Sequence, residues 1–237
     1  MRSTFAFIAS LLAASLFSLP AARADKTVTI GGAQAVLLKP AGAPVGSLIL
    51  LAGGDGHLAI GPNGTITRLQ GNQLVRTRGD YAARGFAVLV PDLGVDLSEA
   101  VAFMAKIKQP VTVVGTSRGT QRAAEGLAQG ARPDALVLTS GFLSPQSGQG
   151  VHRSVIALMG GSPARLPRTL VIHHRQDGCR FTLPSGVEPF VKWSGGKAKV
   201  VWLDGGSSSG DPCQARAYHG FNGLDAQVVS AVAAFAR

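Results

Sequence analysis

The sequence predicts an α/β fold: a mostly parallel sheet with helices on both faces and an antiparallel hairpin at its N-terminal edge. Short apolar runs alternate with amphipathic or Ala-rich segments, which is typical of strands joined by crossover helices. These runs are continuous rather than alternating, as expected for strands buried on both faces. Two strand-like runs, 27–30 and 36–39, flank Gly31-Gly32 and indicate the hairpin.

The remaining elements follow from local signals. Gly85 ends a helix in the usual C-terminal manner, Pro91 stops a strand, and Ser98 is expected to cap a helix that has Glu99 in its first turn. We expect strands at 47–52, 86–90, 111–114, 135–139, 169–173 and 199–203, and helices at about 72–84, 98–108, 121–127, 151–159, 187–193 and 225–236.

The first 24 residues predict a secretory signal peptide. Met1-Arg2 precede an apolar run from Phe5 to Leu19, and Ala22-Arg23-Ala24 form a small-x-small end. The run is too short for a comfortable membrane span, and no later stretch is apolar for long enough. We therefore expect one α/β domain over residues 25–237, without a large cap. The protein should be exported to a periplasm or the medium, without stable membrane insertion.

The formal net charge of +10 does not indicate nucleic-acid binding. The basic residues are scattered, with no run of five or six and no interleaved aromatic residues. Solubility and a loose attraction to anionic envelope surfaces are the expected consequences.

Ser117 is the candidate nucleophile. It lies in Gly115-Thr116-Ser117-Arg118-Gly119, between the strand at 111–114 and an Ala-rich helical segment. A strand that turns directly into a helix holds the hydroxyl at the strand tip, near the positive end of the helix dipole. Gly115 and Gly119 omit β-carbons that would collide with neighbouring backbone. The alternative is a plain structural turn.

A serine hydroxyl needs a base to take its proton and a third group to orient that base. On such a sheet the acid and the histidine come from loops after later strands. Asp177 follows the strand at 169–173, and His219 follows the last strand. Asp204 and Asp211 are alternatives for the acid.

The other four histidines are weaker candidates for the base. We interpret His173 and His174 as satisfied structural residues, while His57 lies beside a glycine loop and His152 in a polar segment. The cluster from His173 to Cys179 could instead hold zinc or copper, but this requires a reduced cysteine, which export disfavours. We expect neither a metal nor an organic cofactor.

Oxyanion donors are expected from two places. One is the backbone N–H of Arg118, directly after Ser117, and the other is an amide of Gly54 or Asp55 in the loop Gly53-Gly54-Asp55-Gly56. The alternative is a tight turn without a catalytic role.

The two cysteines, Cys179 and Cys213, should form a disulfide in an exported protein. Cys179 lies two residues after Asp177, and Cys213 lies six residues before His219. The bridge would tie the acid loop to the histidine loop, or it would only stabilise a secreted protein.

Together these motifs resemble the α/β-hydrolase superfamily over essentially the whole of residues 25–237, and more narrowly a group of small exported bacterial hydrolases. The matching segments are Ala52-Gly53-Gly54-Asp55-Gly56, Gly71-Asn72-Gln73-Leu74-Val75-Arg76, Gly115-Thr116-Ser117-Arg118-Gly119-Thr120, His173-His174 through Asp177 to Cys179, and Pro212-Cys213 with His219-Gly220-Phe221. The resemblance implies Ser117 as nucleophile, Asp177 as acid and His219 as base, and it implies no particular substrate.

The function we expect is serine hydrolysis of a small carboxylic ester or similarly activated acyl bond. Acyl transfer or peptide cleavage by the same residues is the alternative within enzymes, and a non-catalytic envelope-binding protein is the alternative outside them. We expect Asn72, Arg76 and Arg78 to form an exposed polar helix face rather than to order the glycine loop or bind an anionic group. The side chain of Arg118 could pair with a substrate carboxylate or cap a neighbouring loop.

Overall fold

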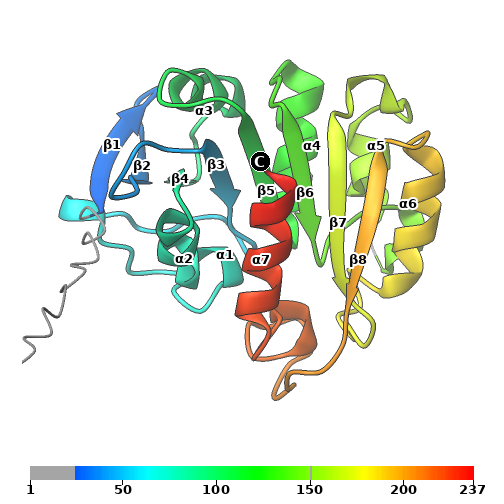
Figure 1. The fold of residues 1–237 in the computed structure, drawn as a ribbon. Coiled ribbons are helices and arrows are strands. Elements are labelled where there is room, and N and C mark those ends of the chain that lie inside the picture. Colours follow the sequence, from blue (N-terminus) through cyan, green and yellow to red (C-terminus); the bar gives the residue numbers. More distant parts are fainter. Residues whose placement is uncertain (1–24, 150) are drawn as a thin grey trace, which may run out of the picture.

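The computed structural model describes residues 25–149 and 151–237, so the expected signal peptide, residues 1–24, lies outside the described residues. Eight strands form one sheet in the order β1-β2-β4-β3-β5-β6-β7-β8 (Figure 1). β1 pairs antiparallel with β2, β2 pairs antiparallel with β4, and all other neighbours are parallel. The strands are β1 (Lys26–Ile30), β2 (Ala33–Leu38), β3 (Gly46–Leu51), β4 (Phe86–Pro91), β5 (Val111–Thr116), β6 (Ala135–Thr139), β7 (Arg168–His174) and β8 (Ala198–Leu203). The predicted fold class is confirmed.

The order of the strands places a crevice at the carboxyl ends of β3 and β5. The chain runs from β3 to β4 on one side and then returns to place β5 on the other side of β3. At such a reversal the two following loops diverge and leave a space in which open α/β sheets bind ligands. Here those loops begin at Ala52 and at Ser117.

Helices cover both faces of the sheet, and every residue of β3, β4, β5 and β6 is therefore buried. Side chains alternate between the faces of a strand. Leu48 and Leu50 therefore pack in one core, while Ile49 and Leu51 pack in the other. The first core is covered by α1 (Gln73–Arg76), α2 (Arg78–Ala83) and α7 (Asp225–Phe235), and the second by α3 (Leu97–Ala105), α4 (Arg118–Gln129), α5 (Val155–Leu158) and α6 (Val187–Trp193) (Figure 1). None of the described helices is long and apolar enough to cross a bilayer.

Three details of the helices differ from the prediction. The helix expected at 151–159 is a 3-10 turn, Val151–Arg153, followed by the short helix α5. The helix expected at 72–84 is two short helices, α1 and α2, which meet at Thr77. The buried hydroxyl of Thr77 donates to the carbonyl of Gln73 at 2.7 Å, a bond of the kind that bends helices. Asp96 rather than Ser98 is the N-cap of α3, since its carboxylate accepts from the N–H of Glu99 at 2.9 Å.

Candidate active site

Ser117 is the single residue between β5 and α4, and its backbone has a φ of 51° and a ψ of −123°. A positive φ of this kind is strained for any residue other than glycine. The neighbouring glycines make the turn possible: a Cβ on Gly115 would lie 2.7 Å from the carbonyl oxygen of Gly119, and a Cβ on Gly119 would lie 2.0 Å from that of Leu51. The Ser117 N–H donates to the carbonyl of Thr139 at 3.0 Å, which holds the turn against β6.

Ser117 lines a cavity of about 350 Å³ at the carboxyl ends of the central strands. Its walls include Gly53 and Gly54, Asn72, Phe142, Phe181, both cysteines and His219. The rings of Phe142 and Phe181 are stacked, with centroids 6.2 Å apart. The cavity thus combines a hydroxyl and an imidazole with an aromatic wall.

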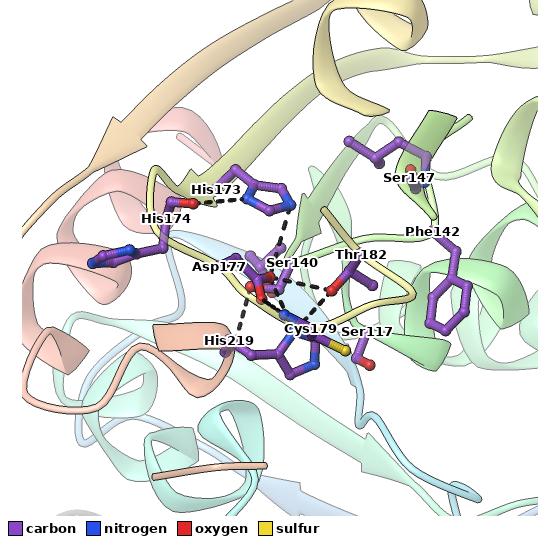
Figure 2. Close-up of polar contacts among 12 residues, drawn as sticks. Ser117, Ser140, Phe142, Ser147, His173, His174, Asp177, Cys179, Thr182 and His219 are labelled. Carbon is purple, nitrogen blue, oxygen red and sulfur yellow. Dashed lines mark hydrogen bonds and ion pairs between the residues drawn. The ribbon is translucent and has the colours of Figure 1, made fainter. Parts of the chain in front are cut away.

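Asp177 and His219 are hydrogen-bonded to each other beside this cavity, although they are 42 residues apart in sequence. Asp177 is buried in the loop after β7, and His219 is in a short 3-10 turn, Tyr218–Gly220. The His219 Nδ1 lies 3.0 Å from Asp177 Oδ2 (Figure 2). The other carboxylate oxygen accepts from the N–H of Cys179 at 2.9 Å. The structure therefore joins the two residues predicted as acid and base.

Thr182 completes this group. Its buried hydroxyl lies 2.9 Å from His219 Nδ1 and 3.2 Å from Asp177 Oδ2 (Figure 2). With the proton of His219 on Nδ1, both the imidazole and the Thr182 hydroxyl donate to the carboxylate, and Nε2 keeps its lone pair. Ser117 and His219 line the same cavity without a direct hydrogen bond between them. Hydrogen bonds of this kind often tighten only in the complex with substrate.

The alternative acids are at the surface. Asp204 forms an exposed ion pair with Arg175 at 3.1 Å. Asp211 accepts from the N–H of Cys213 at 2.7 Å and is exposed. Neither contacts His219 among the described residues. Of the alternative bases, His57 and His152 are exposed.

His174 is the satisfied structural residue that we expected, but His173 is only half satisfied. His174 accepts from the N–H of Gln176 at 3.0 Å, lies 3.0 Å from the carbonyl of Gly205, and stacks on Tyr218. The Nδ1 of His173 lies 3.2 Å from the carbonyl of His174, but its buried Nε2 has no partner among the described residues and lies 3.9 Å from Asp177. Burial lowers the pKa of His173, which favours its neutral form.

The glycine loop after β3 contributes Gly54, with a φ of 60°, to the cavity lining. The side chain of Asp55 instead forms an exposed ion pair with Arg68 at 2.8 Å. The pKa of Asp55 is lowered, mainly because its carboxylate accepts from the N–H of His57 and also because of Arg68. Beneath the loop, Arg122 donates to the carbonyl of Ala52, and burial lowers the pKa of its guanidinium. The Arg118 N–H, at the first position of α4, has no acceptor within the helix.

Cys179 and Cys213 form a disulfide and both line the cavity. The bridge therefore connects the Asp177 loop to the segment that leads into His219. Because the sulfur of Cys179 is bonded to Cys213, it is not a thiolate available for a metal. Among the described residues, no three His, Cys, Asp or Glu side chains are grouped to hold a metal ion.

The helix after the glycine loop is not only an exposed polar face, as we expected, because Arg76 bonds to residues that line the cavity. The side chain of Arg76 is partly buried and donates to the carbonyls of Gly71 at 2.6 Å and Gly220 at 2.7 Å, and it pairs with Asp225 at 2.7 Å. Arg76 thus links one wall of the cavity to the residue after His219. Arg78 pairs with Asp25 at 3.1 Å.

Several residues of the site were not predicted: Thr182, Arg122, Ser140, Phe142 and Phe181. Ser140 donates to the carbonyl of His219 at 2.8 Å from a position 79 residues earlier. Their contacts span distant parts of the chain, so no local pattern indicates them. One general signal exists for Ser140 and Phe142: β5 and β6 run parallel, so the loop after β6 lies at the same edge of the sheet as Ser117.

No protein-family model matches the chain, and no curated protein matches it. Solved structures do match in fold. An esterase domain from a Rhodothermus marinus protein is 16% identical and matches with a TM-score of 0.60 over 89% of this chain and 98% of its own. Est1E from Butyrivibrio proteoclasticus is 17% identical and matches with a TM-score of 0.59 over 90% of this chain and 97% of its own.

A thioesterase domain from the curacin biosynthetic pathway is 14% identical and matches with a TM-score of 0.53 over 91% of this chain and 98% of its own. The likeness therefore extends over nearly the full length of each partner, while the sequences have diverged widely. The chain has the α/β-hydrolase fold that these proteins share.

Proposed function

We propose that this protein is an exported serine hydrolase that cleaves carboxylic esters or similarly activated acyl bonds. One observation carries the proposal: Ser117, in its strained turn, lines the same cavity as His219, whose Nδ1 lies 3.0 Å from the Asp177 carboxylate. The disulfide supports export. The structural neighbours named as esterases and a thioesterase support acyl chemistry on this fold.

In the first half of the proposed reaction, His219 Nε2 takes the proton of the Ser117 hydroxyl as its oxygen attacks the substrate carbonyl carbon. The imidazolium that forms is stabilised by the Asp177 carboxylate, which also fixes the proton on Nδ1. The N–H groups of Arg118 and Gly54 donate to the carbonyl oxygen as it becomes negative. When the tetrahedral intermediate collapses, the C–O bond breaks, the alcohol takes the proton from His219, and an acyl-Ser117 ester remains.

In the second half, water takes the place of the alcohol. His219 removes a proton from the water, the resulting hydroxide attacks the acyl carbon, and Ser117 is released with that proton. The products are a carboxylic acid and the free enzyme. An added alcohol or amine could replace water at this step, which is the chemical basis of the transferase alternative.

A fluorophosphonate probe tests the proposal directly. The Ser117 oxygen should displace fluoride from phosphorus and form a stable adduct, located by mass spectrometry of the Ser117 peptide. The same protein should hydrolyse short p-nitrophenyl esters, and pretreatment with the probe should stop this hydrolysis. A chain that neither takes up the probe nor hydrolyses any ester in a panel of chain lengths is a binding protein instead.

The side chain of Arg118 is expected to favour anionic substrates. It is exposed, lines the cavity beside Ser117, and forms no ion pair among the described residues. Within residues 25–149 and 151–237, no Asp or Glu is part of the cavity lining. Arg118→Gln should therefore lower kcat/KM for an ester with a carboxylate on its acyl group relative to its neutral isostere, by about 2- to 5-fold, the scale of one exposed ion pair.

The ratio of the two kcat/KM values is the quantity to measure, at low and at high salt. Salt screens exposed charges, so the preference of the wild-type protein should shrink as ionic strength rises. Arg132→Gln is the matched control, because it removes the same charge near the opposite end of α4. An unchanged ratio in the Arg118 variant would mean that this cation does not contact substrate.

A further inference from the structure

Asn72 presents its side-chain amide to the cavity beside Ser117. It is the N-cap of α1, and its Oδ1 accepts from the N–H of Leu74 at 3.1 Å. Because the carbonyl end of the amide is used in this way, the NH₂ end is directed elsewhere. Nδ2 and the Cβ of Ser117 each lie 3.1 Å from the position that a Cβ on Gly53 would take. The amide donor and the nucleophile therefore face one space, which exists because residue 53 is glycine.

The NH₂ group of Asn72 is a donor without an acceptor. Nδ2 makes no hydrogen bond to any described residue, although the residue is half-buried and lines the cavity. A side chain whose other end is fixed by a cap does not gain a partner by rotating, since rotation would break the bond to Leu74. The unused donor is thus held in place at the point where a substrate must enter.

The backbone around Asn72 is equally fixed. Its N–H donates to the carbonyl of Leu69 at 2.8 Å, and its carbonyl accepts from the N–H of Arg76 at 2.9 Å. The guanidinium of Arg76 then joins Gly71, directly before Asn72, to Gly220, directly after His219. A donor held this firmly costs no reorganisation when charge develops nearby, which is the property that makes oxyanion donors effective.

We propose that Asn72 is a further catalytic residue whose side-chain amide donates a hydrogen bond to the substrate carbonyl oxygen as it becomes an oxyanion. The inference rests on the proposed function, since it requires Ser117 to attack a carbonyl. It adds a side-chain donor to the two backbone N–H groups of Arg118 and Gly54. Gly53 has a matching role, because a side chain there would fill the space between the donor and the nucleophile.

Asn72→Asp and Asn72→Ser test the role, because both keep a side-chain oxygen that can cap α1 while removing the amide donor. Asn72→Asp should lower kcat for a p-nitrophenyl ester by about 100-fold or more, the usual loss for one oxyanion donor, and Asn72→Ser should lower it by a smaller factor. KM should change by less than about 2-fold in both, because the bond strengthens only as the oxyanion forms. Asn63→Asp is the control, since it makes the same chemical change at an exposed position outside the cavity.

A tetrahedral adduct provides a readout that a purely structural cap would not affect. A trifluoromethyl ketone accepts the Ser117 oxygen at its carbonyl carbon, and its own oxygen becomes the oxyanion. The affinity of the Asn72 variants for this ketone should fall by the same factor as kcat/KM. The thermal midpoint of unfolding should stay close to that of the wild-type protein in both variants.

Each other outcome overturns the proposal. If kcat in both variants stays within about 3-fold of the wild-type value, Asn72 is a helix cap and no more. If KM rises while kcat is unchanged, it binds the ground state only. If activity falls while ketone affinity is retained, it acts through the fold. A wild-type protein with no ester turnover and no fluorophosphonate adduct would instead remove the proposed function itself.

Discussion

Replacing Ser117 with alanine is expected to lower kcat for ester hydrolysis by about 10⁴-fold or more, the scale seen when a serine nucleophile is removed. The backbone should be unaffected, because the N–H of Ser117 still donates to Thr139 and its carbonyl still accepts from Thr120. The measurement is kcat on a p-nitrophenyl ester, with circular dichroism to establish that the variant is folded. Retained turnover would assign the chemistry to another group.

Replacing Ser117 with glycine should abolish turnover equally and yet give a more stable protein than the alanine variant. A non-glycine residue at a φ of 51° and a ψ of −123° carries strain of about 1–3 kcal/mol, which glycine avoids. Glycine also loses about 0.5–1 kcal/mol more conformational entropy on folding, so a net gain of about 1 kcal/mol is expected. This corresponds to a rise of about 2–4 °C in Tm for a chain of this size.

The matched control is the same pair of substitutions at Ser209, which is exposed and does not adopt a positive φ. There the glycine variant should be the less stable of the two, because only the entropy difference remains. If glycine is also the less stable variant at position 117, the turn is not strained. A stable but inactive Ser117→Gly variant would show that the protein gives up stability to expose this hydroxyl.

The parts of the structure that the sequence predicted are those with a local cause. β5 consists mostly of β-branched residues and is buried throughout, and Gly115 and Gly119 are required by close backbone contacts around the turn at Ser117. The order of the strands in the sheet was not predicted, because an apolar run indicates a buried strand but not which strands pair with it. The N-cap of α3 does have a local signal, because Asp96 precedes Glu99 by three residues, which is a capping pattern that competes with the one at Ser98.

Contacts between distant residues account for what could not be predicted in the site. The local sequence pattern predicts that Arg76 is an exposed helix residue, because its partner, Asp225, is 149 residues away. Thr182 is one hydroxyl in a loop, and only the fold brings it within 2.9 Å of His219. The break at Thr77 has a different, local origin: the Thr77 hydroxyl donates to the carbonyl of Gln73, four residues earlier, and this bond competes with regular helix geometry in a buried setting. Periodicity describes faces of elements, and it carries no information about which face meets which partner.

Removing the disulfide, by Cys179→Ser together with Cys213→Ser, is expected to lower the free energy of unfolding by about 3–4 kcal/mol. The bond closes a loop with a sequence separation of 34, and the chain-entropy model gives a loss of this size for such a loop. Urea unfolding of the double variant, compared with the wild-type protein without reductant, measures it. A loss below about 1 kcal/mol would mean that the unfolded chain is already restricted over this loop.

The same variant should lose activity beyond its loss of stability. The N–H of Cys179 holds the Asp177 carboxylate, while Cys213 begins the segment whose Ala215 packs against Gly220 beside His219. Without the bridge, the contacts that remain between these two loops at the site are those of Asp177 and Thr182 with His219 Nδ1. Asp177 and His219 should therefore spend less time aligned, and kcat should fall by about 10-fold or more, as a displacement of catalytic groups allows. Phe86→Ala is the control, because it removes a fully buried side chain at the start of β4 and should cost a similar 3–5 kcal/mol away from the cavity.

If the two variants lose stability alike and only the cysteine variant loses kcat under conditions in which both are folded, the bridge positions the acid and the base. If both keep the wild-type kcat, the bridge stabilises the fold alone, and Thr182 with the Cys179 backbone is sufficient to hold Asp177 against His219.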